Sequence, residues 1–152
     1  MSVSAPSFTV RPATLNDIPV ILDNLIENSL DDFRNYRVNP VVSLAEDISN
    51  SEAYYISTKD NTPMAIVGFE TDCFWMHTCT GVEKHPVSFI KWARRWLDNQ
   101  QKPYLWSHIN INYTQALKMS KAFGFVPLRV YPHFLTEKYT VESVRLWQSK
   151  QF

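Results

Sequence analysis

The chain has 152 residues, of which 45% are hydrophobic and 14% aromatic. A chain of this size can bury about two thirds of its unfolded surface, so the composition excludes wholesale disorder and one domain over residues 1–152 is expected. Fifteen basic and fifteen acidic residues cancel, which argues against a protein whose main task is to grip nucleic acid, although a local basic patch stays open.

Nothing in the sequence directs the chain to a membrane or to an oxidising compartment. No apolar run approaches the ~20 residues of a membrane-spanning helix, and residues 1–7 lack the basic-then-apolar plan of a signal peptide. Cys73 and Cys79 lie in one expected strand, roughly 20 Å apart if it is extended, which is too far for a disulfide. We expect reduced core thiols of a cytoplasmic protein and no metal site.

The first half of the chain predicts a strand, two helices and three further strands. Residues 8–11 alternate like a short strand, and Thr14 with Asp17 forms a variant of the helix capping box. An apolar stripe that starts at Ile18 then predicts one helix over residues 15–30. The elements expected after it are a short helix over 43–48 and strands over 53–58, 64–70 and 73–82. Gly68 in the second of these strands marks a bulge or a close backbone approach.

The second half of the chain alternates helices and strands. The apolar period changes to that of a helix over residues 86–100, and residues 104–111 alternate again as a strand. An amphipathic helix carrying Ala116, Met119 and Phe123 follows and ends at Gly124, which can take the left-handed cap conformation. The last expected elements are a hairpin of strands 125–131 and 134–139 and a terminal helix over 141–151. This order predicts an α/β fold with a mixed, mostly antiparallel sheet.

Two landmarks together resemble the GNAT superfamily of acetyl-CoA-dependent N-acetyltransferases. They are the Arg-Pro-Ala-Thr start at residues 11–14 and the late helix that ends in Gly124 and Phe125. The order of elements is also that of the family, so the resemblance covers nearly the whole chain. It implies the acyl-CoA N-acyltransferase fold, with helices on both faces of the sheet, and acetyl-CoA as the cofactor if the protein is active.

The loop that would hold the cofactor departs from the family pattern. In the family, a glycine-rich loop after the central strand holds the pyrophosphate of coenzyme A with backbone amides at a helix N-terminus. Here the equivalent residues 80–88 keep Gly81 alone, while Pro86 removes an amide donor and Glu83 adds a negative charge. The cofactor-binding residues that the resemblance implies are Thr80, Gly81, Val82, Lys84, His85, Ser88 and Asn112.

The catalytic acid of the family is also replaced. Many members carry a tyrosine four residues before the Gly-Phe pair, where it protonates the departing thiolate. Ser120 holds that position here, and a serine hydroxyl is a poor general acid. The asparagine that opens the family's helix is one residue out of register, because the spacing points to Tyr113 and not to Asn112.

Three side chains are candidate general bases for an amine substrate. Glu70 and Asp72 lie at the end of the strand before the central one, and His77 lies in the central strand, which we expect to neighbour the strand of His108. Each has an ordinary alternative, namely a solvated turn pair for the two acids and a hydrogen-bonded strand residue for a histidine.

Short GNAT-like proteins with these departures occur in T7-like bacteriophages, where one is an internal virion or core-assembly protein. The chain is similar to them in Phe74-Trp75, in Leu105-Trp106 and in the lost glycine loop. The resemblance implies weak or absent catalysis and a role through protein contacts in virion assembly or host interaction, in the host cytoplasm or the virion. The alternatives are an active N-acetyltransferase of a small amine or protein amine, and a small-ligand sensor.

One helix carries the residues that would make such a protein contact. Trp92 lies off the apolar stripe beside Lys91, Arg94 and Arg95, so it is either a partly exposed interface anchor or packed under a loop. The basic residues, with Lys84, form a small basic face whose ordinary interpretation is a solvated helix surface. We expect a protein partner or self-association, and no nucleic acid or membrane partner.

Overall fold

The structure is a computed structural model that describes residues 7–35, 38–132 and 139–146. In chain order its elements are β1 (Phe8–Pro12), η1 (Leu15–Asp17), α1 (Ile18–Asn24), α2 (Glu27–Asn35), α3 (Pro40–Asn50), β2 (Glu52–Thr58), β3 (Pro63–Glu70), β4 (Cys73–Thr78), α4 (Gly81–Lys84), α5 (Pro86–Asn99), β5 (Tyr104–Asn110), α6 (Thr114–Ala122), β6 (Val126–Pro132) and β7 (Tyr139–Leu146). In the part of the chain that is described, no helix is long and apolar enough to cross a membrane.

The strands form a seven-stranded sheet in the order β1-β2-β3-β4-β5-β7-β6. The pairs β1–β2, β2–β3, β5–β7 and β6–β7 are antiparallel, whereas β4 and β5 pair in parallel at Cys73 and Trp106. A parallel pair joined through the helix α5 is the arrangement that the β-α-β order requires. The predicted class, α/β with a mixed and mostly antiparallel sheet, is therefore confirmed.

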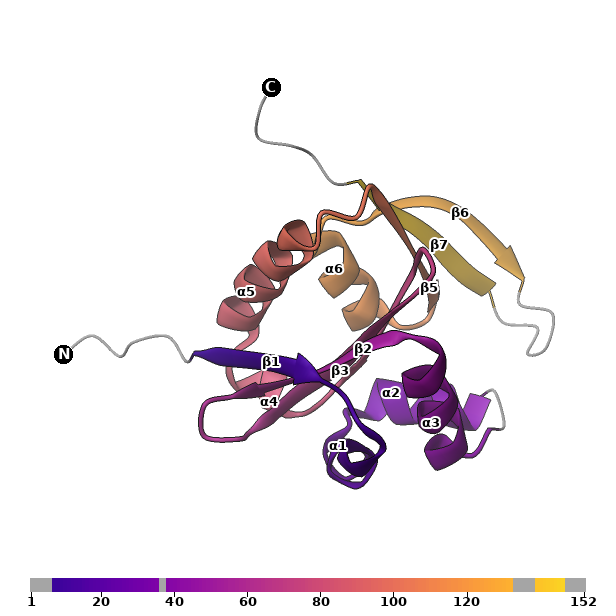
Figure 1. The fold of residues 1–152 in the computed structure, drawn as a ribbon. Coiled ribbons are helices and arrows are strands. Elements are labelled where there is room, and N and C mark those ends of the chain that lie inside the picture. Colours follow the sequence, from indigo (N-terminus) through magenta and orange to yellow (C-terminus); the bar gives the residue numbers. More distant parts are fainter. Residues whose placement is uncertain (1–6, 36–37, 133–138, 147–152) are drawn as a thin grey trace. The chain divides into compact units, whose positions relative to one another are not determined.

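The chain folds as two compact units. The first comprises residues 1–71 and 75–89, and the second comprises residues 72–74 and 90–152. In the first unit, α1, α2 and α3 lie together beside the strands β2 and β3 (Figure 1). In the second, α5 and α6 lie side by side along β5 and β7 (Figure 1). The prediction that all 152 residues make one domain stays a prediction.

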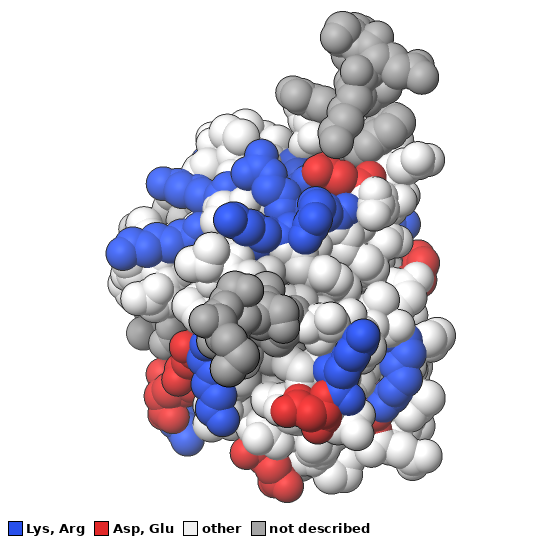
Figure 2. Space-filling view, turned by 90° about the vertical axis from the view of Figure 1, so that its left-hand side faces the viewer, with Lys and Arg blue, Asp and Glu red and all other residues white. Residues whose placement is uncertain are grey.

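The two units carry opposite charge, which the neutral total conceals. The first has five basic and eleven acidic residues, a formal charge of −6, and the second has ten basic and four acidic residues, a formal charge of +6. Lys and Arg side chains gather on the upper part of the face that Figure 2 shows. Charge separation on this scale creates strong local fields that a sum over the chain cannot report.

The predicted single helix over residues 15–30 is wrong, because the segment breaks into η1, α1 and α2. The break lies at Leu25, whose φ of −64° and ψ of 144° are extended. Leu25 forms an isolated antiparallel bridge with Cys79. The amide of Ile26 donates to the carbonyl of Thr78 at 3.0 Å, and that of Thr80 donates to the carbonyl of Asn24 at 2.8 Å. These bonds to the end of β4 replace the helical bonds that an unbroken helix would make.

One predicted strand end and one predicted helix also need correction. The strand expected over 73–82 stops at Thr78, and the last four of those residues enter the turn of α4. The helix expected from residue 141 is the strand β7, which pairs with β5 in the register Leu105↔Arg145. Its alternate side chains Val141, Ser143 and Arg145 are buried, which is the period of a strand. Residues 133–138 and 147–152, with His133 and Trp147, lie outside the described residues.

The other elements agree with the sequence within a few residues, and two glycines serve as expected. Gly124 has a φ of 101° and caps α6, since its amide donates to Lys121 and the amide of Phe125 donates to the carbonyl of Ser120. This pair of bonds is the Schellman motif. Gly68 lets the indole of Trp75 lie on the backbone of β3, because any Cβ there would overlap the ring.

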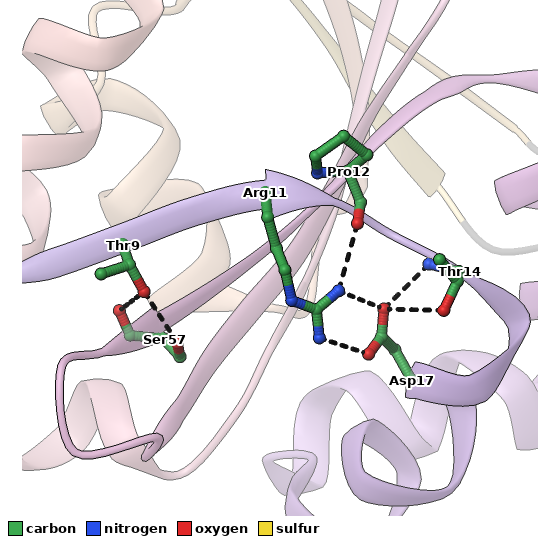
Figure 3. Close-up of polar contacts among 6 residues, drawn as sticks. All are labelled: Thr9, Arg11, Pro12, Thr14, Asp17 and Ser57. Atoms are coloured by element: carbon green, nitrogen blue, oxygen red, sulfur yellow. Dashed lines mark hydrogen bonds and ion pairs between the residues drawn. The ribbon is translucent and has the colours of Figure 1, made fainter.

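The Arg-Pro-Ala-Thr start has a structural role in the first unit. Arg11 reaches from β1 to the carboxylate of Asp17 and donates to both of its oxygens, at 2.9 and 2.7 Å (Figure 3). The amide of Thr14 donates to the same carboxylate at 2.8 Å, which is half of the expected capping box. These bonds, the guanidinium first, lower the pKa of Asp17. The motif therefore fixes the turn from β1 into the helices.

Arg145 has the corresponding role in the second unit. It is 5% exposed, and its Nε donates to the carbonyl of Phe123 at 2.6 Å, where α6 ends. Its Nη2 bonds Asp98 of α5 and approaches the carbonyl of Arg94 at 3.5 Å. One guanidinium on β7 thus holds both helices to the sheet.

Replacing this guanidinium tests its role. Arg145→Met keeps the apolar stem and removes every donor, so we expect a loss of about 3 kcal/mol in the free energy of unfolding, measured by urea denaturation. Arg129→Met is the matched control, because Arg129 pairs with Glu142 on the exposed side of β6 and should cost less than about 1 kcal/mol. Equal effects of the two substitutions would contradict the role of Arg145.

Candidate functional site

Four backbone amides of the expected cofactor loop form hydrogen bonds within the protein itself. The amide of Val82 donates to Cys79 at 3.2 Å, that of Glu83 to Thr80 at 3.0 Å, and that of His85 to Val82 at 3.1 Å. With the bond from Thr80 to Asn24, these contacts turn the segment into the compact turn of α4. An anion site needs amides that point outward without partners, and the loop does not present such a row.

Gly81 serves packing in this turn. It is buried, and a Cβ at this position would overlap the carbonyl oxygen of Pro63 at the start of β3. Its neighbour Val82 is 3% exposed. The glycine is therefore needed for the close approach of α4 to β3.

The groups that remain for an anion lie at the start of α5. Lys84 is exposed and His85 is half-buried, and the amides of Val87 and Ser88 belong to the first turn, where helical amides have no intrahelical acceptor. Glu83 is exposed beside Lys84 and offsets its charge. Two side chains and two amides form a partial cradle, weaker than the amide loop that the resemblance implies.

His77 is held among aromatic rings on β4. Its ring stacks on Phe33 of α2 with centroids 5.0 Å apart and lies 5.7 Å from the ring of Trp75. Its Nδ1 is buried and has no hydrogen-bond partner among the described residues. Burial lowers the pKa of His77 to about 4, so the ring is neutral at pH 7 and can accept a proton from a group placed beside it.

The two acids that the sequence proposes as bases do not form a pair with His77 in the described contacts. Glu70 is exposed where β3 ends, and Asp72 is exposed in the turn that follows. The backbone of Asp72 accepts the amide of Trp106 at 2.8 Å, so this residue starts the parallel pairing of β4 and β5. Its role in the structure is that of a strand start.

A perturbed carboxyl group that sequence reasoning missed lies near Glu70. Asp47 of α3 is half-buried, and its pKa is raised to about 6 by burial first and by the charges of Glu70 and Glu46 second. The sequence could have indicated its burial, because Asp47 lies three residues after the fully buried Leu44 and therefore on the inward face of the helix. The charge of Asp47 therefore changes close to neutral pH.

The catalytic and cofactor candidates of the second unit are also separated by burial. Ser120 is 7% exposed, and its Oγ has no partner among the described side chains and backbone groups. Asn112 is exposed in the turn before α6, and its amide donates to Oδ1 of Asn110 at 2.9 Å. The two candidate positions therefore differ in exposure, and their roles in catalysis and cofactor binding stay predictions.

His108 belongs to a polar network that sequence reasoning also missed. Its Nε2 lies 3.1 Å from Oε2 of Glu142 on β7, and Arg129 of β6 donates to Oε1 of the same carboxylate at 2.8 Å. Arg129 first and His108 second lower the pKa of Glu142. The network could not be anticipated while Glu142 was assigned to a terminal helix.

Comparison with known proteins supplies a fold. No protein-family model and no curated protein sequence matches the chain. A solved chimera of the spermidine N-acetyltransferase SpeG from Vibrio cholerae with hSSAT matches it with a TM-score of 0.69 at 12% identity, over 92% of this chain and 95% of that one. A GNAT-family acetyltransferase from Bacillus anthracis matches with a TM-score of 0.68 at 8% identity, over 98% and 100%. The chain has the GNAT fold.

The low pKa of His77 predicts acid instability of the GNAT-fold chain. The folded state binds the proton about two pH units below the ordinary value of 6.5, so stability falls as the pH drops from about 6.5 toward 4. His77→Phe keeps a ring between Phe33 and Trp75 and removes the titration. We expect the free energy of unfolding, measured with urea, to fall between pH 6.5 and pH 4 in both proteins. The fall should be roughly 1–2 kcal/mol smaller in the variant than in wild type. Parallel curves would show that His77 titrates freely.

The raised pKa of Asp47 predicts the opposite pH dependence from that of His77: its contribution to stability becomes less favourable as the pH rises. At pH 7.5 its charge is held against burial, so Asp47→Asn should stabilise the chain by on the order of 1 kcal/mol. The gain should vanish near pH 4, because the carboxyl group of Asp47 is then protonated, and so uncharged, in folded wild type. Glu46→Gln, an exposed change on the same helix, should alter stability by a few tenths of a kcal/mol, roughly. A destabilised Asp47→Asn at every pH would contradict the pKa assignment.

Proposed function

We propose that this GNAT-fold, acetyltransferase-like chain has weak or no acyl-transfer activity and acts through protein contacts. The observation that carries the proposal is the use of the loop amides of residues 82, 83 and 85 inside the protein. Each charge-assisted hydrogen bond to an anion contributes ~1.5–3 kcal/mol, so a loop that offers none of these three amides forfeits several orders of magnitude in affinity.

The chemistry of the transfer step supports the same proposal. Ser120 stands where the family places its tyrosine, and its buried hydroxyl is a poor donor of a proton to a thiolate. Cys79 is no substitute nucleophile, because burial raises the pKa of its thiol to about 12. Neither residue offers a proton or an electron pair at neutral pH.

The helix α5 supports a role through contacts. Trp92 is half-buried and stacks on Trp96 with ring centroids 6.1 Å apart, and Lys91 and Arg95 are exposed on the same helix. A partly exposed tryptophan beside cations is a common interface anchor. A protein partner, a bacteriophage origin and a place in the virion or host cytoplasm stay predictions.

An acetyl-CoA-dependent N-acetyltransferase of a small amine or protein amine is the second candidate. The buried Nδ1 of His77 favours it, because this nitrogen has no hydrogen-bond partner among the described residues and is available to accept the proton of an attacking amine. Both solved neighbours named above are described as acetyltransferases. Bound acetyl-CoA would supply the activated thioester, and Lys84, His85 and the amides of Val87 and Ser88 would hold its phosphates.

Calorimetric titration with acetyl-CoA separates the two candidates. We expect a dissociation constant weaker than about 100 μM for wild type. Glu83→Gly/Pro86→Gly removes a negative charge and restores an amide, so it should bind at least about fivefold more tightly. Lys59→Ala, an exposed lysine in the β2–β3 turn, is the control and should not change binding. Low-micromolar binding by wild type would favour the enzyme and contradict the proposal.

A further inference from the structure

The second unit presents a continuous basic surface on its two helices. The surface consists of Lys91, Arg94 and Arg95 of α5 and Lys118 and Lys121 of α6, and all five side chains are exposed. We call it the basic face. Arg94 joins its two halves, because Nη1 donates to the carbonyl of Ala122 at the end of α6, at 3.2 Å. In Figure 2 blue side chains dominate the upper part of the molecule.

Among the described residues of its own unit, the basic face has no ion-pair partner for four of its five cations. None of the ion pairs among the described residues involves Lys91, Arg95, Lys118 or Lys121. The acid of α5, Asp98, is taken by the buried Arg145. Like charges held within a Debye length repel each other, so an anionic surface brought against this face would relieve that repulsion.

The first unit carries a matching excess of negative charge. Its formal charge is −6 against +6 for the second unit. Glu46 and Glu70 are exposed around the half-buried Asp47, and neither is in an ion pair of the described part of the chain. After burial, which is the larger cause, the charges of Glu70 and Glu46 raise the pKa of Asp47.

We propose that the basic face is an interface that binds the acidic first unit of a second copy of this chain. Each copy then offers one surface of each sign, so contacts are head to tail and close into rings or extend as open chains. The equal and opposite charges supply the complementarity. This inference rests on the proposed function, because it takes the role of the chain to be one of protein contacts.

Sedimentation velocity at two salt concentrations tests the interface. At 50 mM NaCl we expect a mass above that of the 17.7 kDa chain that grows with protein concentration, and at 500 mM NaCl we expect the monomer. Lys91→Glu/Lys118→Glu should be monomeric at both. The matched control Arg34→Glu/Lys59→Glu makes the same change in net charge in the first unit and should still associate. Circular dichroism checks that each variant is folded.

Charge exchange makes the test specific to the two surfaces. Glu46→Lys/Glu70→Lys should also be monomeric, but an equimolar mixture with Lys91→Glu/Lys118→Glu should associate, because each variant then carries the surface that the other needs. A mixture that stays monomeric would overturn the proposal. So would a monomeric wild type that binds a labelled single-stranded 20-mer through the basic face.

A third measurement keeps this inference apart from the proposed function. Lys91→Glu/Lys118→Glu should bind acetyl-CoA as wild type does in calorimetry, whatever that affinity is. If both binding and association change, the basic face belongs to the cofactor site, and the proposed interface is wrong. If wild type binds acetyl-CoA tightly while the charge exchange still restores association, the interface holds and only the proposed function fails.

Discussion

The end of β4 is held by backbone hydrogen bonds on two sides, and much of the first unit follows from them. The amide of Cys79 donates to Met64 of β3 at 2.9 Å, while Thr78 and Thr80 bond the junction between α1 and α2. Successive residues of a strand direct their amides to alternate edges, so the junction takes one edge and β3 takes the other. The junction must be extended to reach β4, which is why the helix breaks at Leu25.

The same bonds decide what the loop after β4 can do. With Thr80 tied to Asn24, the chain turns at once into α4, and the turn uses the amides of Val82, Glu83 and His85 in its own hydrogen bonds. Gly81 then fits against Pro63, where a side chain would not. A fold shared with acetyltransferases at 12% identity or less therefore comes with a loop that serves structure, and function has to be argued from the site.

Local signals in the sequence were enough for most of the fold but for little of the site. The cap at Gly124 was predictable because a glycine after an apolar helical stripe needs no distant partner. The helix break at Leu25, the strand β7 and the buried Arg145 were not, since each depends on residues far along the chain: Cys79, β5 and Phe123. The separation of charge was present in the sequence, but the charges cancel in the net charge of the whole chain. It becomes visible only when the charges are counted for each unit.

Stability and chemistry rest on different residues in this chain. Arg11 with Asp17 fixes one unit, and Arg145 fixes the other by placing a cation at the carbonyl end of α6, where the helix dipole favours it. Neither group is a catalytic candidate. Conversely, the Oγ of Ser120 makes no hydrogen bond with the described residues, so removing this hydroxyl breaks no hydrogen bond that holds α6. A GNAT fold built in this way can lose its cofactor chemistry and keep its architecture, which leaves its surfaces free to acquire another role.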